Sequence, residues 1–352
     1  MHLPTQRPWL ISPLDPTFCP PYLSTPIHTL HNFLWTHRLF AFLQKCAPYE
    51  LASEVLENLV DSIEEEDRKR DEEGEKRREG LRVVDFGSGS SSSGGRESGR
   101  TVLAVERKIN QHRQSSSKQP IRFLLTHPDL PSSSSSSSSH SLPTSSSSST
   151  ISYLPESVDA RQATINNKAI RDHRHIRTFF STFHQFGEES ARRVIVDAFG
   201  SAEAMCIFEL QQSDLASLIM VFLLAPLSWL LTPFQRPTWT TLFFTYIIPL
   251  IPLLLVLDGI MKVYRSRSIP HFLHLANLAS LNFHLEGGKP EEDIDWKWEY
   301  GKKRHTWSLG TMVWVVGRRD RRNDRRGGGE GSESDSDSDS DLGMEAGVEE
   351  LL

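Results

Sequence analysis

Apolar residues recur at helical spacing in the N-terminal part of the chain, between about residues 26 and 59. Their spacing of three or four positions is typical of one or two amphipathic helices with one buried face. From residue 64 to residue 79, charged residues of both signs replace the apolar ones. We therefore expect a solvated helix extension or linker there, and an N-terminal helical region over residues 1–80.

Short apolar runs then alternate with amphipathic stretches. The runs predict strands at 82–86, 121–126, 151–154, 177–183 and 205–210, helices at 101–111 and 188–199, and two closing strands at 296–300 and 312–316. Such alternation indicates a parallel sheet with helices on both faces. The fold class we expect over residues 81–317 is α/β, a Rossmann-like doubly wound sheet with a C-terminal antiparallel strand pair. The second helix is expected to end before Gly200.

Two long apolar stretches, 215–231 and 239–257, carry no charged side chain. Each approaches the roughly 20 apolar residues that cross a bilayer, and Trp229, Trp239 and Tyr246 could anchor at its interface. We expect an inserted hydrophobic helical hairpin, 215–257, that attaches to a membrane. The alternative is a pair of buried helices that cover the functional site.

The charges beside the hairpin are asymmetric. Its downstream flank carries Lys262, Arg265 and Arg267, whereas the connecting loop carries only Arg236. Positive residues favour the cytosolic side, so we expect a membrane-associated protein whose main domain faces the cytosol. Prolines inside the two stretches leave open whether the hairpin crosses the bilayer or enters one leaflet.

Composition restricts the remaining regions. A serine-rich insert at 132–150 and a charged tail at 318–352 cannot offset their ordering entropy by burial, so we expect both to be disordered. The net charge of −6 argues against a nucleic-acid partner. The cysteines Cys19, Cys46 and Cys206 show no paired spacing, so neither a metal site nor a disulfide framework is indicated.

The most informative motif is residues 85–89, where an apolar strand ends in Asp-Phe-Gly-Ser-Gly. Two glycines one residue apart allow a tight turn and a close approach of the backbone to a ligand. A dinucleotide-binding loop would need a third glycine where Ser92 stands, and a P-loop would need Gly-Lys-Ser/Thr, which is absent. A site for S-adenosylmethionine, which carries no phosphate, needs neither. An ordinary turn after a strand remains the structural alternative.

Together with this motif, several further sequence blocks follow one another in the order and spacing of a known family. They are residues 84–89, 122–126, 156–160, 177–186, 208–211, 296–299 and 311–317. In this order the chain resembles class I S-adenosylmethionine-dependent methyltransferases, most of all uncharacterised, largely fungal members with a hydrophobic hairpin. The resemblance covers about two thirds of the chain.

The resemblance implies a cofactor site for S-adenosylmethionine. Gly87 and Gly89 would pass beneath the methionine part of the cofactor, with Asp85 nearby. Asp159 matches the acidic residue that accepts a hydrogen bond from the adenine amino group.

Further roles follow from the same resemblance. Ser157 and Val158 would flank the adenine ring. Members of the family usually end the second strand with an acidic residue that binds the ribose, but here His127 stands there and Asp129 could substitute from two positions on. His184 matches the strand end that faces the transferred methyl group, and is either the catalytic base or a structural histidine.

The implied activity is methyl transfer from S-adenosylmethionine to a small-molecule or lipidic acceptor. Glu209, at the end of the fifth strand, either lines the acceptor pocket or faces solvent. The departure at the second strand and the serine-rich cofactor loop favour an alternative, a catalytically inactive methyltransferase-like membrane scaffold. An NAD-dependent oxidoreductase is disfavoured by Ser92 and by the closing strand pair.

Overall fold

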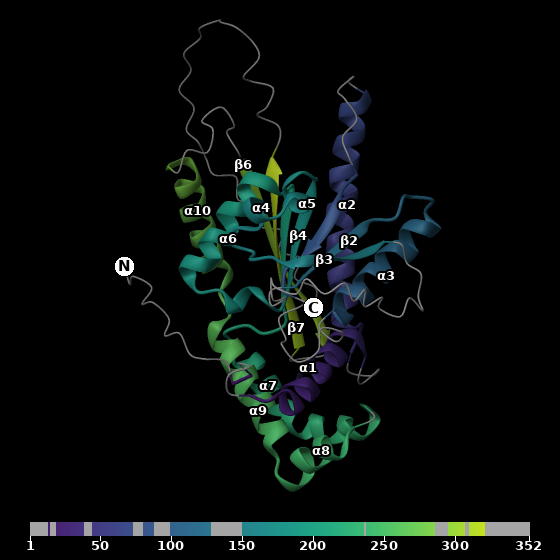
Figure 1. The fold of residues 1–352 in the computed structure, drawn as a ribbon, viewed down its shortest axis with the longest axis vertical. Coiled ribbons are helices and arrows are strands. Elements are labelled where there is room, and N and C mark those ends of the chain that lie inside the picture. The colour runs from purple at the N-terminus through teal and green to yellow at the C-terminus, as the bar shows by residue number, and fades with distance from the viewer. Residues whose placement is uncertain are drawn as a thin grey trace, which may run out of the picture.

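The structure is a computed structural model that describes residues 13–14, 19–38, 44–72, 80–87, 99–127, 150–235, 237–285, 295–306 and 310–320. Most of the serine-rich insert and of the charged tail therefore lies outside the described residues. At the centre is a seven-stranded sheet in the order β3-β2-β1-β4-β5-β7-β6 (Figure 1).

The sheet combines a parallel core with an antiparallel end. Its strands are β1 (Arg82–Asp85), β2 (Arg122–His127), β3 (Ile151–Ser157), β4 (His175–Phe180), β5 (Ala204–Glu209), β6 (Asp295–Thr306) and β7 (Gly310–Asp320). Strands β1 to β5 are parallel, and β7 runs antiparallel to both β5 and β6. This confirms the predicted α/β class and its closing strand pair. Strand order reverses between β1 and β4, which is the position where doubly wound sheets bind ligands.

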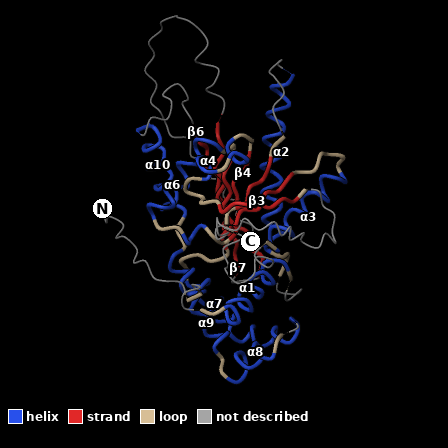
Figure 2. The backbone as a smooth tube through the Cα atoms, in the orientation of Figure 1, coloured by secondary structure: helices blue, strands red, loops and turns tan. Residues whose placement is uncertain are grey.

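Helices cover both faces of the sheet, as Figure 2 shows in blue around the red strands. The helices are α1 (Pro21–Thr36), α2 (Pro48–Glu72), α3 (Arg100–Ser115), α4 (Ala163–Asn166), α5 (Lys168–Arg171), α6 (Glu188–Ser201), α7 (Leu215–Leu231), α8 (Trp239–Leu242), α9 (Leu250–Arg265) and α10 (Ile269–Leu285), with short turns η1 (Phe183–Gln185), η2 (Thr232–Gln235) and the π-helical η3 (Phe243–Ile247). Alternate residues of one strand enter opposite cores. Cys206 and Phe208 pack with α2 and α3, whereas Met205 and Ile207 pack with α6 and α10.

Three elements differ from the expectation. The helix α6 continues through Gly200 to Ser201, and α10 follows the hairpin where we predicted no element. The second apolar stretch is not one helix, because α8 and η3 end at Ile247 and meet α9 at an angle of 76°. Pro249 lacks the backbone N–H that would continue the helical hydrogen bonds.

A charged side chain lies in the middle of the buried strand β4. Arg177 is fully buried and donates hydrogen bonds from Nη2 to Asp197 Oδ2 and to Ser201 Oγ of α6, both at 2.7 Å. Its Nε donates to His175 Nε2 at 3.4 Å, and His175 Nδ1 donates to the His173 carbonyl at 2.9 Å. Burial, and then the adjacent Arg177 cation, lower the pKa of His175 to about 4.

This histidine should make stability depend on pH. An unfolded histidine has a pKa of about 6.5, so the unfolded chain takes up the proton first as the pH falls, whereas folded His175 stays neutral down to about pH 4. We expect this group to lower the free energy of unfolding by about 2 kcal/mol between pH 7 and pH 5. Urea denaturation at both pH values checks this. His175→Gln should flatten the pH dependence, and an unchanged slope in that variant would contradict the assignment.

Candidate functional site

The turn after β1 packs tightly against the segment that follows β4. Asp85, the last residue of β1, is buried, and Thr178 Oγ1 donates to its Oδ1 at 3.3 Å. Gly87 has a φ of +112°, and a Cβ there would lie 2.6–2.7 Å from three side-chain atoms of Thr182. Thr182 also donates from Oγ1 to the Phe86 carbonyl at 3.0 Å. Both the backbone conformation and this contact therefore require glycine at position 87.

The end of β4 holds a strained residue. Ser181 has a φ of +48°, which is uncommon for a residue with a side chain. Its N–H donates to the Phe208 carbonyl at 2.8 Å, and its buried Oγ has no hydrogen-bond partner among the described residues. Strained backbone persists where the surroundings enforce it, often at functional sites. Here it lies beside the switch point between β1 and β4.

The predicted adenine-binding residues follow β3. Val158 is buried in the core cluster on the α6 side of the sheet. The Asp159 carboxylate accepts hydrogen bonds from Arg161 Nε and Nη2, the shortest at 2.6 Å. These hydrogen bonds from the Arg161 side chain lower the pKa of Asp159, and 39% of its side chain is exposed. Asp159 therefore presents an ionised carboxylate at the surface.

The other predicted cofactor residues are described less fully. Gly89 and Asp129 lie outside the described residues, and of Ser157 only the backbone is described. Ser157 pairs with His127 between β3 and β2, so the two strand ends lie together. The sheet thus places Asp85 and Asp159 at the carboxyl ends of β1 and β3, on either side of β2.

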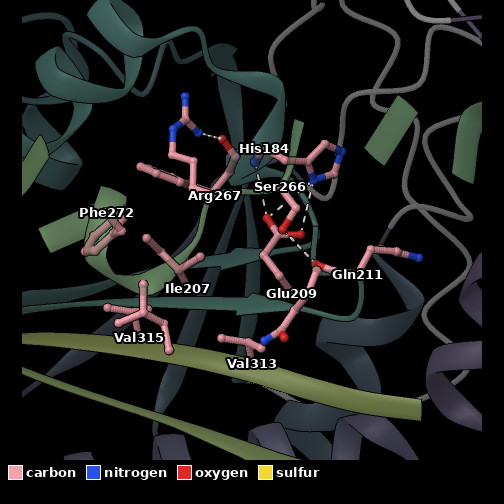
Figure 3. Close-up of a pocket in the computed structure, with 12 residues that line it drawn as sticks. His184, Ile207, Glu209, Gln211, Ser266, Arg267, Phe272, Val313 and Val315 are labelled. Atoms are coloured by element: carbon pink, nitrogen blue, oxygen red, sulfur yellow. Dashed lines mark hydrogen bonds and ion pairs between the residues drawn. The ribbon is translucent and has the colours of Figure 1, made fainter. Parts of the chain in front are cut away.

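A second cluster lies across β4 from the glycine turn. His184 is in η1, only two residues beyond Thr182, and is buried. Its ring Nδ1 lies 3.1 Å from Glu209 Oε2, and its backbone N–H donates to Glu209 Oε1 at 3.2 Å (Figure 3). Since a carboxylate only accepts hydrogen bonds, the proton of a neutral His184 ring belongs on Nδ1. Its Nε2 then has a free lone pair that can accept a proton.

The His184–Glu209 pair lines a pocket to which β5 and β7 contribute residues. The pocket opens to solvent, and the centre of a water-sized sphere can occupy about 40 Å³ of it. Its apolar lining residues are Phe183, Ile207, Ile269, Phe272, Val313 and Val315. Figure 3 shows Ile207, Phe272 and Val315 on the side of the pocket away from His184. An apolar body with one polar group near His184 fits this lining.

Polar groups complete the pocket wall. Arg267, between α9 and α10, donates hydrogen bonds to the carbonyls of Phe183 and Phe186, and its guanidinium lies 5.5 Å from the centre of the Phe183 ring. Gln211 Oε1 is buried without a hydrogen-bond partner among the described residues. A bound molecule with a hydrogen-bond donor would satisfy it.

Sequence reasoning found His184 but missed most of this pocket. For Glu209 the sequence leaves both the pocket and solvent open, although a polar residue at the end of an apolar strand favours a place in a site. Nothing in the sequence assigns Gln211 or Arg267 to a pocket. The pocket forms only where the segment between α9 and α10 packs beside the end of β5.

The chain shows weak similarity to some solved structures. No protein-family model matches the chain, and a search of curated proteins finds no match. Among solved structures, LepI in complex with SAM aligns at 12% identity and a TM-score of 0.32, covering 68% of this chain and 43% of LepI. Loganic acid methyltransferase with SAH aligns at 10% identity and a TM-score of 0.34, covering 90% and 99% of the two chains. The chain thus spans less than half of LepI, and TM-scores of 0.32 and 0.34 support no conclusion about the family or activity of this chain.

Proposed function

We propose that the protein transfers a methyl group from S-adenosylmethionine to an acceptor bound in the pocket beside His184. The proposal rests on the position of the short segment after β4, which contacts both the glycine turn and the pocket. Its residue Thr182 touches Gly87 of the glycine turn, and its residue His184 lines the pocket. A cofactor at the β1 turn and an acceptor in the pocket would therefore meet at this segment, at the switch point of the sheet.

The described residues fit this cofactor. Asp159 offers an exposed carboxylate as an acceptor for the adenine amino group, beside the buried Val158. Asp85 and the backbone at Gly87 would hold the amino-acid part, together with Gly89, while Ser157 and Asp129 would complete the adenosyl site. S-adenosylmethionine would supply an activated methyl group on a sulfonium, so the protein has mainly to position the two reactants.

His184 and Glu209 supply the remaining chemistry. Glu209 fixes the orientation of the His184 ring through Nδ1, which leaves Nε2 to take a proton from an acceptor O–H or N–H group. This role suits acceptors that must lose a proton on methylation. The apolar lining of the pocket favours an acceptor with an apolar body, such as a lipid or a small apolar molecule.

We include in the proposal a membrane attachment through residues 215–257, with the catalytic domain on the cytosolic side. By length and composition, one described helix, Leu215–Gln235, is apolar enough to cross a membrane, and the bent pair Trp239–Ile247 and Leu250–Arg265 passes the same test together. These criteria alone are weak support. The exposure of the hairpin's side chains, described below, adds a second and independent argument.

An inactive methyltransferase-like membrane scaffold is the second candidate. Two observations favour it. Thr182 already covers one side of Gly87, and Arg161 already occupies most of the acceptor positions on Asp159.

Cofactor binding separates the two candidates. Isothermal titration of the full chain with S-adenosylhomocysteine should show binding, and Asp159→Ala should weaken it about tenfold to a hundredfold, because a hydrogen bond to a charged group contributes about 1.5–3 kcal/mol. Asp172→Ala is the matched control, since Asp172 forms a similar exposed pair with its neighbour Arg171. No binding at millimolar ligand would leave the scaffold as the function.

A further inference from the structure

Exposed apolar side chains are concentrated on the hairpin. Fifteen of the twenty large apolar side chains exposed in the described residues lie between residues 215 and 264. From residue 222 onward, the most exposed of them are Trp239 at 87%, Phe234 at 77% and Ile247 at 71%. All three belong to the part we call the hairpin tip, residues 222–257, whose α8 segment projects from one end of the molecule in Figure 1. A concentration of exposed apolar side chains of this kind marks an interaction site.

Several polar side chains of the hairpin tip are hydrogen-bonded within the tip itself, whereas Gln235 Nε2 is buried without a hydrogen-bond partner among the described residues. Thr232 donates to the Ser228 carbonyl at 2.6 Å, and Thr245 donates to the Thr241 carbonyl at 2.7 Å. Trp229 Nε1 donates to the Thr245 carbonyl at 3.0 Å and so joins α7 to η3. Internal satisfaction is what a hydrocarbon environment demands, because lipid tails offer no hydrogen bonds. Apart from Arg236, the tip carries no charged residue.

A buried charged cluster limits how much of the hairpin can enter lipid. Asp258 of α9 is 4% exposed, pairs with Lys262 at 2.7 Å and lies 3.8 Å from His31 of α1. Val221 of α7 lies at the same level, because a Cβ on the adjacent Gly259 would come within 2.6 Å of it. The helix α1 covers this cluster, so these charges are shielded by protein and mark the base of the hairpin tip.

The helices of the hairpin beyond this charged cluster are too short to cross a bilayer. From residue 222 to residue 235 a helix covers about 20 Å at 1.5 Å per residue, and α9 contributes only about 12 Å from residue 250 to residue 257. The hydrocarbon core of a bilayer is about 30 Å thick. Between these two arms, α8 and η3 turn away from α9 by 76°. This shape suits a segment that lies within one leaflet.

We propose that the hairpin tip inserts into one leaflet of a lipid bilayer and does not cross it. The helix α1 braces it, since Leu23, Ile27 and Leu30 share a core with Leu224 and Leu255. This insertion rests on the membrane attachment in the proposed function. Its test uses neither cofactor nor acceptor, so a negative result for insertion is distinct from a negative result for methyl transfer.

Cysteine labelling in vesicles tests the mode of insertion. In the full chain with Cys46→Ser, which removes the native cysteine that is not buried, Thr240→Cys places a thiol on α8 and Ser116→Cys places one on an exposed turn after α3. A membrane-impermeant maleimide is either added outside phosphatidylcholine–phosphatidylserine vesicles or enclosed within them. We expect vesicles to slow external labelling at position 240 at least tenfold, no labelling from the lumen, and no effect at position 116.

Two results would overturn the proposal. Labelling of position 240 from the lumen would show that the hairpin crosses the bilayer. External labelling that vesicles do not slow would show that the tip stays outside lipid, and concentration-dependent dimerisation would then assign this face to a second copy of the chain.

Charged substitutions give an independent test. Trp239→Glu, Phe243→Glu and Ile247→Glu together should lower the vesicle-bound fraction in flotation at least about tenfold, because charged residues are costly in lipid. Ile165→Glu, at a residue 73% exposed on the sheet domain, should leave it unchanged. An equal effect of both changes would contradict insertion through the tip.

Discussion

Replacing Asp197 by alanine should lower the free energy of unfolding by about 3–5 kcal/mol, because it leaves a buried charge without its partner. The Arg177 side chain is 0% exposed and its Nη2 lies 2.7 Å from Asp197 Oδ2. Asp197 also accepts hydrogen bonds from the N–H and hydroxyl of Thr164, so its loss would detach α4 from α6 as well. Urea denaturation measured at pH 7 gives the difference directly.

The same helix provides a control. Glu189 of α6 pairs with Arg192 and Arg193 on the surface, and its side chain is 55% exposed. Exposed pairs contribute about 1 kcal/mol or less, so Glu189→Ala should be mild. Replacing Asp197 by leucine and Arg177 by methionine together should recover much of the loss, because no orphaned charge remains. Equal losses for the two single variants would contradict the assignment.

His184→Gln should lower methyl transfer by about 10²–10⁴-fold, the usual contribution of a general base, and leave the affinity for S-adenosylhomocysteine unchanged. The ring is held by Glu209 at 3.1 Å and lines the pocket, whereas the predicted cofactor residues lie at the ends of β1 and β3. Incorporation of a labelled methyl group into vesicle lipids or a lipid extract measures transfer, and titration calorimetry measures affinity.

Two further variants decide whether His184 acts chemically. His112→Gln changes an exposed histidine on α3 and should leave transfer unchanged. Glu209→Gln should lower transfer less than His184→Gln does, because Glu209 positions the ring and takes no proton itself. If His184→Gln abolishes cofactor binding together with transfer, its role is structural. Undiminished transfer would remove it from the mechanism.

The sequence predicted the sheet well because buried parallel strands are continuous apolar runs. The expected strands at 82–86 and 205–210 correspond to β1 and β5 within a residue at either end. The helix α10 escaped prediction. The prolines inside the apolar stretch at 239–257 indicate a kink, and the break falls at Pro249, but its angle of 76° is not visible in the sequence. Apolar character alone does not show where a helix bends or which neighbour covers it.

The site was less accessible from sequence than the fold. The glycine motif and the family resemblance indicate Asp85, Gly87, Asp159 and His184 as site residues, and the structure places each of them at or just beyond a strand end. The partner of His184 depends on how β4 and β5 lie side by side, which no local pattern reveals. Thr182 against Gly87 and Arg177 against Asp197 are likewise contacts between distant segments.

Strand β7 lies between β5 and β6 although it follows both in the chain. Met312 and Val316 of this strand belong to the same buried cluster as Leu56 and Val60 of α2, about 250 residues earlier. During synthesis, α2 and the edge of β5 are therefore made before β7, the strand that covers them. Until residue 320 has left the ribosome, the nascent chain carries an open, aggregation-prone edge.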